Sequence, residues 1–471
     1  MDYVLGIDIG TTAVKAVLLG QDGALGQVVS ARYSLNAGGE GRFEQDPEEM
    51  LGAIAQAVQQ AAAGQSVRGI GLSTQGAALL VLDEHNQPLR PIVSWMDHRA
   101  AAEKQELLDR FGESFFAART GMPRPGCNVP ALLWLKRHEP DVMSRVRRVS
   151  LVEDWLGLWL TGNGCSDPTN AIITGMMNLD TLDWDAELLA AVGVDAALLP
   201  PMRRAGEPLG QLRPEAAERL GLAAGIPVAA AGHDQHMAGL GAGLVEPGMS
   251  MLSTGTAWVT FAISTDIDRD KAVGLYAAPS VLGAGWGALD AMPAGNGYFD
   301  RMVEMLGVAD YAQADAEAEA AGAGAGGLAF VPCVAGNREA AWVGLRLDHG
   351  RGHMLRAIME GLAMEAAVMF RDMEAATGRV REVRMLGGSS KSRLWAQIAA
   401  SALERPVTIP GTRDAAAVGA TVLGGLAAGW WESVPIGRQQ VRLVVDCIEP
   451  EPGAYAEATA RFADARTRLG A

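Results

Sequence analysis

A short strand–turn–strand motif occurs twice in this chain, about half a chain length apart. The first copy, at 9–15, reads Ile-Gly-Thr-Thr-Ala-Val-Lys, and the second, at 254–259, reads Thr-Gly-Thr-Ala-Trp-Val. In both copies a Gly-Thr turn joins two apolar segments, a pattern that predicts paired β-strands. A supersecondary unit repeated at this distance predicts two related domains that face each other. We expect them to span 1–244 and 245–471, since Gly and Pro cluster around the boundary.

The rest of the chain alternates apolar strands with amphipathic helices, which favours an α/β fold. Asp46 followed by Pro47 predicts a helix start, and Gly64 predicts the end of that helix. The apolar spacing between 353 and 377 predicts a long helix. The uncharged stretch 247–265 is rich in Gly, Ser and Thr, so we expect a pair of buried strands there rather than a membrane span.

The charge balance limits the partners of the chain. Its 471 residues include 39 Lys and Arg against 55 Asp and Glu, for a net charge of −16. A surface this acidic argues against nucleic acid or an anionic membrane as a partner. A phosphate ligand must then be held by local groups, such as a glycine-rich turn, a helix N-terminus, one lysine or a metal ion.

The N-terminus and the cysteines indicate a compartment. Met1-Asp2 starts the chain without a basic segment, so we expect no signal peptide. Four well-separated cysteines, without metal-ligand spacing, fit free thiols in a reducing environment: Cys127, Cys165, Cys333 and Cys447. We therefore expect a soluble cytoplasmic protein, and a homodimer is one option for its assembly.

The first candidate site is the segment from Asp8 to Lys15. A tight turn at Gly10, Thr11 and Thr12 exposes backbone N–H groups and two hydroxyls, which are good donors to phosphate, and Lys15 adds a positive charge. Asp8 stands at a strand end, where it could hold Mg²⁺ directly or through water. An ordinary β-hairpin is the alternative for the turn alone. Asp8, Lys15 and the second Gly-Thr turn together favour phosphate binding.

The second candidate is Asp234, which follows the apolar run 226–231. A carboxylate between a buried strand and a helix of small residues is well placed to act as a general base. The alternative is a helix N-cap, a common role for aspartate. His233 and His236 lie beside it, but two histidines without a third ligand are a weak metal signal.

Two further segments could contact ligands. An apolar strand followed by Gly387, Gly388 and Ser389 and then a helix predicts a nucleotide-binding edge, because unpaired N–H groups point at the ligand. In 94–99, the face of Trp95 suits the C–H side of a sugar, and Asp97 and Arg99 could pair with its hydroxyls. A surface turn with a half-buried Trp is the alternative for this second segment.

Taken in order, these segments resemble the FGGY family of carbohydrate kinases over roughly residues 3–430. The resemblance is carried by Asp8 to Lys15, Trp95 to Arg99, Asn128 to Lys136, Leu160-Thr161-Gly162 with Asp183-Trp184, Gly232-His233-Asp234, Ser253 to Ala257, Phe330-Val331-Pro332 with Gly336 to Glu339, Arg356 to Gly361, and Gly387 to Ser389 with Trp395. So many matches in one order are more specific than any single motif.

This resemblance implies a two-domain actin-like ATPase fold of the ribonuclease-H-like class, with ATP and a sugar in the cleft between the domains. The N-terminal domain would bind sugar and phosphate and supply Asp234 as catalytic base, and the C-terminal domain would bind nucleotide. Mg²⁺ would be anchored near Asp8. The residues implied to face ATP are Gly10, Thr11, Thr12, Lys15, Thr254, Gly255, Thr256, Gly387, Gly388 and Ser389.

The chain departs from well-known members of the family at the sugar pocket. Aligned on Asp83, xylulose kinases carry Gln-Met-His-Gly where this chain has Gln75-Gly76-Ala77-Ala78, and glycerol kinases carry Arg-Glu at 76–77. The small residues would leave room and remove donors. The residues implied to bind sugar are Gln75, Gly76, Ala77, Trp95, Asp97, Asp234 and Gln235.

The segment 95–99 fits the pentulose-kinase pattern, whereas Gln235 matches the glycerol enzymes. The resemblance thus implies ATP-dependent phosphorylation of a ketopentose such as D-xylulose, giving xylulose 5-phosphate. Another ketose or a polyol is the second choice. A sugar-responsive ATPase or regulator on the same fold is the alternative from a different class. The presence of both Asp8 and Asp234 favours the kinase.

Overall fold

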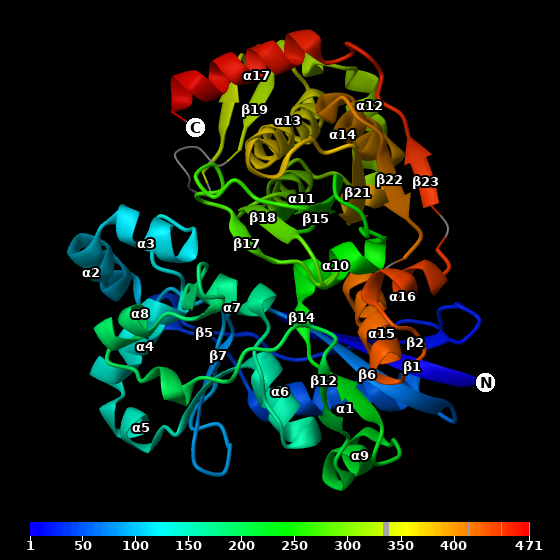
Figure 1. The fold of residues 1–471 in the computed structure, drawn as a ribbon. Coiled ribbons are helices and arrows are strands. Elements are labelled where there is room, and N and C mark those ends of the chain that lie inside the picture. The colour runs from blue at the N-terminus through cyan, green and yellow to red at the C-terminus, as the bar shows by residue number, and fades with distance from the viewer. Residues whose placement is uncertain (333–338, 413, 444, 471) are drawn as a thin grey trace. The chain divides into compact units, whose positions relative to one another are not determined.

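The computed structural model describes residues 1–332, 339–412, 414–443 and 445–470, so Cys333 and most of the segment Gly336 to Glu339 lie outside the described residues. The chain forms two compact units (Figure 1). The first comprises 1–245, 272–287 and 412–442, and the second comprises 246–271, 288–411 and 443–471. The first break lies next to the predicted boundary at 244/245. The two later segments of the first unit differ from the continuous division expected from the sequence.

The first unit is built on a twisted sheet with the strand order β12-β13-β6-β1-β2-β3, and β14 also pairs with β6. Strands β1, β13 and β14 run parallel to β6, whereas β2 is antiparallel to both β1 and β3. The strands are β1 (Asp2–Ile9), β2 (Ala13–Gly20), β3 (Val29–Arg32), β6 (Ser66–Thr74), β12 (Pro208–Gln211), β13 (Pro227–Ala229) and β14 (Gly232–His233).

Helix α15 (Ala415–Ala427) covers one face of this sheet, although it follows β1 by some 400 residues in the sequence (Figure 1). Its contact with the strands is made through backbone atoms. A Cβ added at Gly6 would lie 2.2 Å from the carbonyl oxygen of Ala417, and one at Gly71 would lie 1.9 Å from that of Ala420. Only glycine in the strands permits this close approach. The run of Ala, Gly and Val in α15 has the same cause, since small side chains on the helix also permit this close approach.

Helix α1 (Pro47–Ala61) packs against β2 and β3 and contributes Met50, Ile54 and Val58 to the core. The Asp46 carboxylate accepts hydrogen bonds from the backbone N–H groups of Glu48 and Glu49, so the predicted cap is confirmed. The other helices of the unit are α2 (Ala101–Phe111), α3 (Glu113–Thr120), α4 (Asn128–His138), α5 (Pro140–Arg145), α6 (Val152–Thr161), α7 (Pro168–Thr174), α8 (Ala186–Ala191), α9 (Pro214–Leu220), α10 (Asp234–Ala242) and α16 (Val434–Gln440).

A smaller sheet in the first unit has the order β4-β5-β8-β7-β9. Its β7 and β9 contribute to a separate apolar core with α2, α3 and α4. These shorter strands are β4 (Asn36–Ala37), β5 (Phe43–Gln45), β7 (Leu79–Leu82), β8 (Ile92–Val93), β9 (Arg148–Leu151), the pair β10 (Met177–Asn178) and β11 (Asp183–Trp184), and β17 (Tyr276–Pro279), which packs on α7.

The second unit contains a sheet in the order β18-β16-β15-β21-β22-β23 and a two-stranded sheet, β19-β20. The predicted strand pair within 247–265 is present as antiparallel β15 and β16. These strands are β15 (Met249–Thr254), β16 (Trp258–Ser264), β18 (Trp286–Met292), β19 (Ala329–Val331), β20 (Ala341–Val343), β21 (Glu382–Gly387), β22 (Val407–Pro410) and β23 (Val445–Ile448).

The predicted long helix is α13 (Arg351–Thr377), whose apolar side chains are buried against β16, β19 and α14. Helix α17 lies along β19 and α13 (Figure 1). The remaining helices are α11 (Asn296–Met305), α12 (Tyr311–Ala321), α14 (Arg393–Leu403) and α17 (Ala456–Leu469). Within the described part of the chain, no helix has the length and apolar character needed to cross a membrane.

Candidate active site

Three neighbouring parallel strands of the first unit end at the same edge of the sheet. The register sets Asp8 of β1 beside Ser73 of β6, and Ser73 beside Gly232 of β14. Asp234 follows β14 directly and begins helix α10. Two carboxylates that are far apart in the sequence are thus delivered to one edge by strand pairing. Ligand sites commonly form at the carboxyl ends of parallel strands.

Asp8 is buried, and its carboxylate accepts a hydrogen bond of 2.7 Å from the Ser73 hydroxyl. Burial raises the pKa of Asp8 to about 6. The nearby Lys15 opposes this shift, whereas the negative charges of Asp234 and Asp414 add to it. The site therefore holds more negative charge than its lysine balances, and it suits a cation or a proton.

Lys15 faces Asp8 across the β1–β2 hairpin, and its Nζ lies 2.6 Å from Oδ1 of Asp414. Burial alone would lower the pKa of Lys15, but Asp8 and Asp414 raise it above the ordinary value, so the side chain is cationic. Asp414 was not predicted from the sequence. It comes immediately before α15, where an aspartate suggests a cap, yet the structure shows no side-chain cap there.

Asp234 is the first residue of α10, and His233 takes the N-cap position, so the alternative of Asp234 as N-cap is not what the structure shows. Its side chain is 28% exposed. Burial raises the pKa of Asp234 to about 6, while the backbone N–H of Gln235 and the charge of Lys15 oppose the shift. A carboxylate with a pKa in this range can accept a proton near neutral pH. Within the described part of the chain, the buried Oε1 of Gln235 has no hydrogen-bond partner.

The turn at Gly10, Thr11 and Thr12 is held from several sides. The Gly10 N–H donates to the carbonyl of Ala13, which closes the hairpin. Oγ1 of Thr11 accepts a hydrogen bond of 2.9 Å from Nε1 of Trp95. Thr12 is exposed. Trp95 is 45% exposed, so its indole remains available to a ligand while its N–H is fixed on the turn.

Gln75 supports this turn through a network of buried hydrogen bonds. Its side chain is buried, and its Nε2 donates to Oε1 of Gln45, which in turn donates from its own Nε2 to the carbonyl of Thr11. The Tyr33 hydroxyl donates to the carbonyl of Gly10 and also lies within hydrogen-bonding distance of Gln75. Gln75, predicted to bind sugar, is therefore occupied within this network.

Gly76 and Ala77 do not leave the room that the sequence suggested. A Cβ added at Gly76 would meet Cδ2 and Nε2 of His233 at 2.7 and 2.8 Å, so the imidazole already fills that space. Ala77 is 2% exposed and adopts a φ of 57°, which a side chain larger than glycine's adopts only with strain. The interpretation of an enlarged pocket at this point was wrong, because it did not include His233.

Asp97 has a structural role in the first unit. Its carboxylate accepts hydrogen bonds from the backbone N–H of Phe43 at 2.8 Å and from the guanidinium of Arg99, including NH2 at 2.6 Å. The side chains of Asp97 and Arg99 are almost completely buried. Both oxygens of Asp97 are therefore taken by the protein itself, which favours the structural turn over a sugar contact.

In the second unit, the turn after β15 is anchored at its first residue. Oγ1 of Thr254 donates to the carbonyl of Leu386 at 2.5 Å, and the residue is buried. The Gly255 N–H donates to the carbonyl of Ala257, two residues on, whereas in the first unit the Gly10 N–H donates to Ala13, three residues on. Thr256 is exposed. Of the two hydroxyls, that of Thr256 is the one available to a ligand.

A cavity of about 500 Å³ adjoins this turn within the second unit. Gly387, with a φ of 93°, lies so close to the Thr254 carbonyl that only glycine fits there. Flat aromatic and small polar side chains together suit a nucleobase and its ribose. The residues that line the cavity are Thr254, Gly255, Thr256, Asn296, Phe299, Asp300, Tyr311, Ala312, Asp315, Gly388, Ser389, Lys391, Ser392 and Trp395.

Several residues of this cavity were not predicted. Asn296 links its parts, since Oδ1 accepts hydrogen bonds from Nε1 of Trp258 and from the Ser389 hydroxyl, both at 2.8 Å. Asn296 and the aromatic residues of α11 and α12 lie in helical segments that carry no recognisable ligand-binding motif. Nothing in their spacing indicates a ligand.

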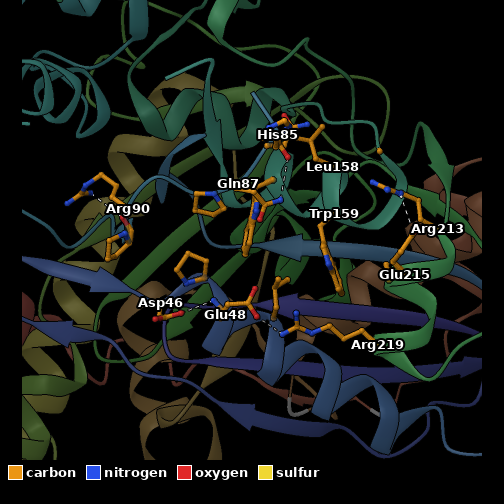
Figure 2. A pocket seen from close by; sticks show the side chains of 18 residues that line it. Asp46, Glu48, His85, Gln87, Arg90, Leu158, Trp159, Arg213, Glu215 and Arg219 are labelled. Atoms are coloured by element: carbon orange, nitrogen blue, oxygen red, sulfur yellow. Dashed lines mark hydrogen bonds and ion pairs between the residues drawn. The ribbon is translucent and has the colours of Figure 1, made fainter. Parts of the chain in front are cut away.

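A larger hollow of about 670 Å³ lies elsewhere on the first unit, between α1, the loop after β7, α6 and α9 (Figure 2). Two ion pairs join residues of its lining: Arg219 lies 3.0 Å from Glu48, and Arg213 lies 3.6 Å from Glu215. None of the predicted site residues lines it. Size alone therefore does not identify the reaction site, and the edge with Asp8 and Asp234 remains the candidate.

Each unit thus carries a Gly-Thr turn after a strand. In the first unit the turn follows β1 at the sheet edge that also holds Asp8 and Asp234, and in the second it adjoins the cavity of about 500 Å³. The family comparisons are specific. Residues 3–241 match the N-terminal domain of the FGGY family of carbohydrate kinases, and residues 226–428 match its C-terminal domain. The chain belongs to this family, so it is an enzyme that phosphorylates a sugar, and ATP is the phosphoryl donor of the family.

Named relatives agree with this assignment. The chain is 31% identical to a xylulose kinase of Lactococcus lactis subsp. lactis (strain IL1403), over 77% of this chain and 75% of the relative. It is 27% identical to a gluconokinase of Bacillus subtilis (strain 168), over 91% and 88%. The structure is similar to that of xylulose kinase from Rhodospirillum rubrum, with a TM-score of 0.91, 26% identity and 99% of each chain covered. The fold is thus the two-domain actin-like, ribonuclease-H-like fold predicted from the sequence.

Proposed function

We propose that this enzyme transfers the γ-phosphoryl group of ATP to the terminal hydroxyl of a ketopentose, with D-xylulose giving xylulose 5-phosphate as the leading choice. The names of the Lactococcus and Rhodospirillum relatives support the substrate. The observation that carries the proposal is the Asp234 carboxylate, whose pKa is raised to about 6 and which shares one sheet edge with Asp8 and Lys15.

Asp234 would be the general base. Its carboxylate accepts the proton of the sugar hydroxyl while that oxygen forms a bond to the γ-phosphorus, and the bond from phosphorus to the β,γ-bridging oxygen breaks to release ADP. Lys15 and the N–H groups of the 10–12 turn would stabilise the charge on the transferred group. Positioning and electrostatics supply most of the acceleration in phosphoryl transfer.

Mg²⁺ is proposed at Asp8. Among the residues that the structure describes, no three His, Cys, Asp or Glu side chains form a metal-ligand set. Magnesium at phosphate sites is commonly held by one or two carboxylates, with water and phosphate oxygens as the other ligands. The oxygen donors of Asp8 fit that requirement, and the excess negative charge around it favours a cation. When bound, Mg²⁺ would neutralise charge on the phosphates.

The nucleotide is proposed to bind in the second unit. Its base would lie against Phe299, Tyr311 or Trp395 in the cavity, and its phosphates would meet the turn at Thr256. Support comes from the exposed Thr256 hydroxyl and from Ser389, which lies on the turn that follows β21. In the first unit, the exposed Thr12 and the Thr11 turn would face the transferred phosphate.

The test is an ADP-release assay over D-xylulose, L-xylulose, D-ribulose, gluconate and glycerol, with Asp234→Asn as the matched control. We expect kcat/KM to be highest for a ketopentose and poor for glycerol, and we expect Asp234→Asn to lower the sugar-dependent rate by ~10²–10⁴-fold. Gluconate tests the activity in the name of the Bacillus relative. A preference for gluconate or glycerol would overturn the ketopentose assignment. ADP release without any sugar dependence would overturn the kinase mechanism itself.

A further inference from the structure

The residue before the proposed base is a buried histidine whose ring lies against the carboxylate. Nε2 of His233 is 3.3 Å from Oδ1 of Asp234. The ring also packs closely against Gly76, where an added Cβ would come within 2.8 Å of both Nε2 and Cδ2. Because Gly76 has no side chain, the imidazole fits against its backbone, and this close contact leaves the ring little room to move. The contact between His233 and Asp234 is therefore fixed by the packing of the ring at this sheet edge.

The backbone of His233 is fixed as firmly as its ring. Its N–H donates to Oγ1 of Thr169 at 3.0 Å, and the Thr169 hydroxyl donates to the carboxylate of Asp167. That carboxylate also accepts from the backbone N–H of Ala205 at 2.8 Å. Strand β14 is thus tied to α7 by a buried chain of hydrogen bonds. The position of the imidazole relative to Asp234 follows from this frame.

The protonation of the ring can be deduced from its surroundings. Burial lowers the pKa of His233 to about 3, so the imidazole is neutral and carries one N–H. Nδ1 is buried and finds no hydrogen-bond partner among the residues that the structure describes. A buried N–H without an acceptor is costly, so the proton belongs on Nε2, which faces the carboxylate. In this tautomer His233 presents a donor to Oδ1.

We infer that His233 is a positioning residue for the base: its Nε2–H donates to Oδ1 of Asp234 in the working complex and leaves Oδ2 to accept the proton of the sugar hydroxyl. The inference rests on the proposed function of Asp234. Catalytic hydrogen bonds are often loosely aligned before the substrate binds and tighten afterwards. His233 would touch neither sugar nor phosphate and would act through the carboxylate.

The test compares His233→Leu, which keeps bulk but removes the donor, with His233→Gln, whose amide restores an N–H. For the best sugar of the panel, we expect His233→Leu to lower kcat about 10- to 100-fold, while KM changes by less than about threefold. His233→Gln should recover most of that loss. Equal losses in both variants, or a loss confined to KM, would overturn the inference.

Gly76→Ala gives an independent measurement without touching either polar group. The new methyl would displace the ring, and the φ of Gly76 is compatible with alanine. We expect a loss of kcat in Gly76→Ala that is absent when His233 is already Leu. A normal kcat in Gly76→Ala would count against a requirement for the ring position.

The role of Asp234 is tested separately. In an Asp234→Asn background, His233→Leu should change the residual rate by less than about twofold, because there is no base left to orient. If Asp234→Asn alone keeps normal turnover, the proposed function fails whatever His233 does. If Asp234→Asn is inactive but His233→Leu is not, only the positioning role fails. The control is His236, whose ring centre lies 5.9 Å from that of His233. His236→Leu and His236→Gln should not show a loss of kcat that the Gln variant recovers.

Discussion

Replacing Asp234 with Asn should remove activity and at the same time make the protein more stable at alkaline pH. Burial raises the pKa of Asp234 from 3.8 to about 6. Ionising this side chain therefore costs more free energy in the folded state than in the unfolded chain. Each pKa unit corresponds to about 1.36 kcal/mol. The asparagine is close in size and carries no charge to desolvate.

The magnitude depends on pH in a defined direction. A carboxyl with a raised folded-state pKa favours folding below its unfolded pKa, and this advantage is lost as the pH rises through the folded value. Relative to an uncharged side chain, Asp234 thus lowers the free energy of unfolding by about 3 kcal/mol at pH 8. The reduction is about 1 kcal/mol at pH 4.5, where the folded protein carries this carboxyl mostly protonated. We expect Asp234→Asn to raise Tm by about 2–8 °C at pH 8 and by much less at pH 4.5.

The assay is thermal unfolding of both proteins at the two pH values, together with ADP release at pH 8. Sugar-dependent turnover should fall by ~10²–10⁴-fold. Asp109→Asn, at an exposed aspartate of α2, is the control and should show no such pH-dependent gain. A variant that melts below wild type at pH 8 would refute the reasoning, because Asp234 would then be a stabilising part of the helix terminus.

Three further outcomes follow from the site. Lys15→Met should move the acid limb of the kcat/KM profile from about pH 6 to higher pH, since Lys15 lowers the pKa of Asp234; an unmoved limb would contradict this electrostatic coupling. Thr256→Val should raise KM for ATP and leave Tm unchanged. Thr254→Val should lower Tm, because the buried Thr254 hydroxyl donates to the Leu386 carbonyl. The reverse pattern would mean that the roles of the two hydroxyls were misassigned. Asp97→Ala should destabilise the fold by about 3–5 kcal/mol in unfolding measurements, and a selective rise in KM for the sugar would instead restore Asp97 as a ligand contact.

Sequence patterns were sufficient where the cause of the structure is local. The helix at Pro47 begins where Asp46 can cap it, and the long helix at 351–377 follows its apolar spacing. The strand pairs around both Gly-Thr turns are likewise determined by neighbouring residues. Asp8 and Asp234 were predicted as site residues because each stands where a buried strand ends, and the strand register brings both to one edge of the sheet.

The remaining features depend on contacts between distant segments. Asp414 precedes a helix, so it suggested nothing more than a cap, and only the packing of α15 brings it to Lys15. Asp97 lies in a polar turn, where burial with Arg99 cannot be foreseen. Gly76 suggested an open pocket, because a sequence does not show that the His233 ring fills the space beside this glycine.

The order of synthesis gives the position of α15 a further consequence. A ribosome that has released the first 245 residues has not yet supplied 412–442, which the first unit needs. Translating the intervening residues takes roughly 10 to 30 s at ordinary rates. During that time the faces of β1 and β6 around Gly6 and Gly71 lack their covering helix. The strand faces around Gly6 and Gly71 thus stay uncovered until α15 is made, and the ion pair of Lys15 forms only when Asp414 emerges.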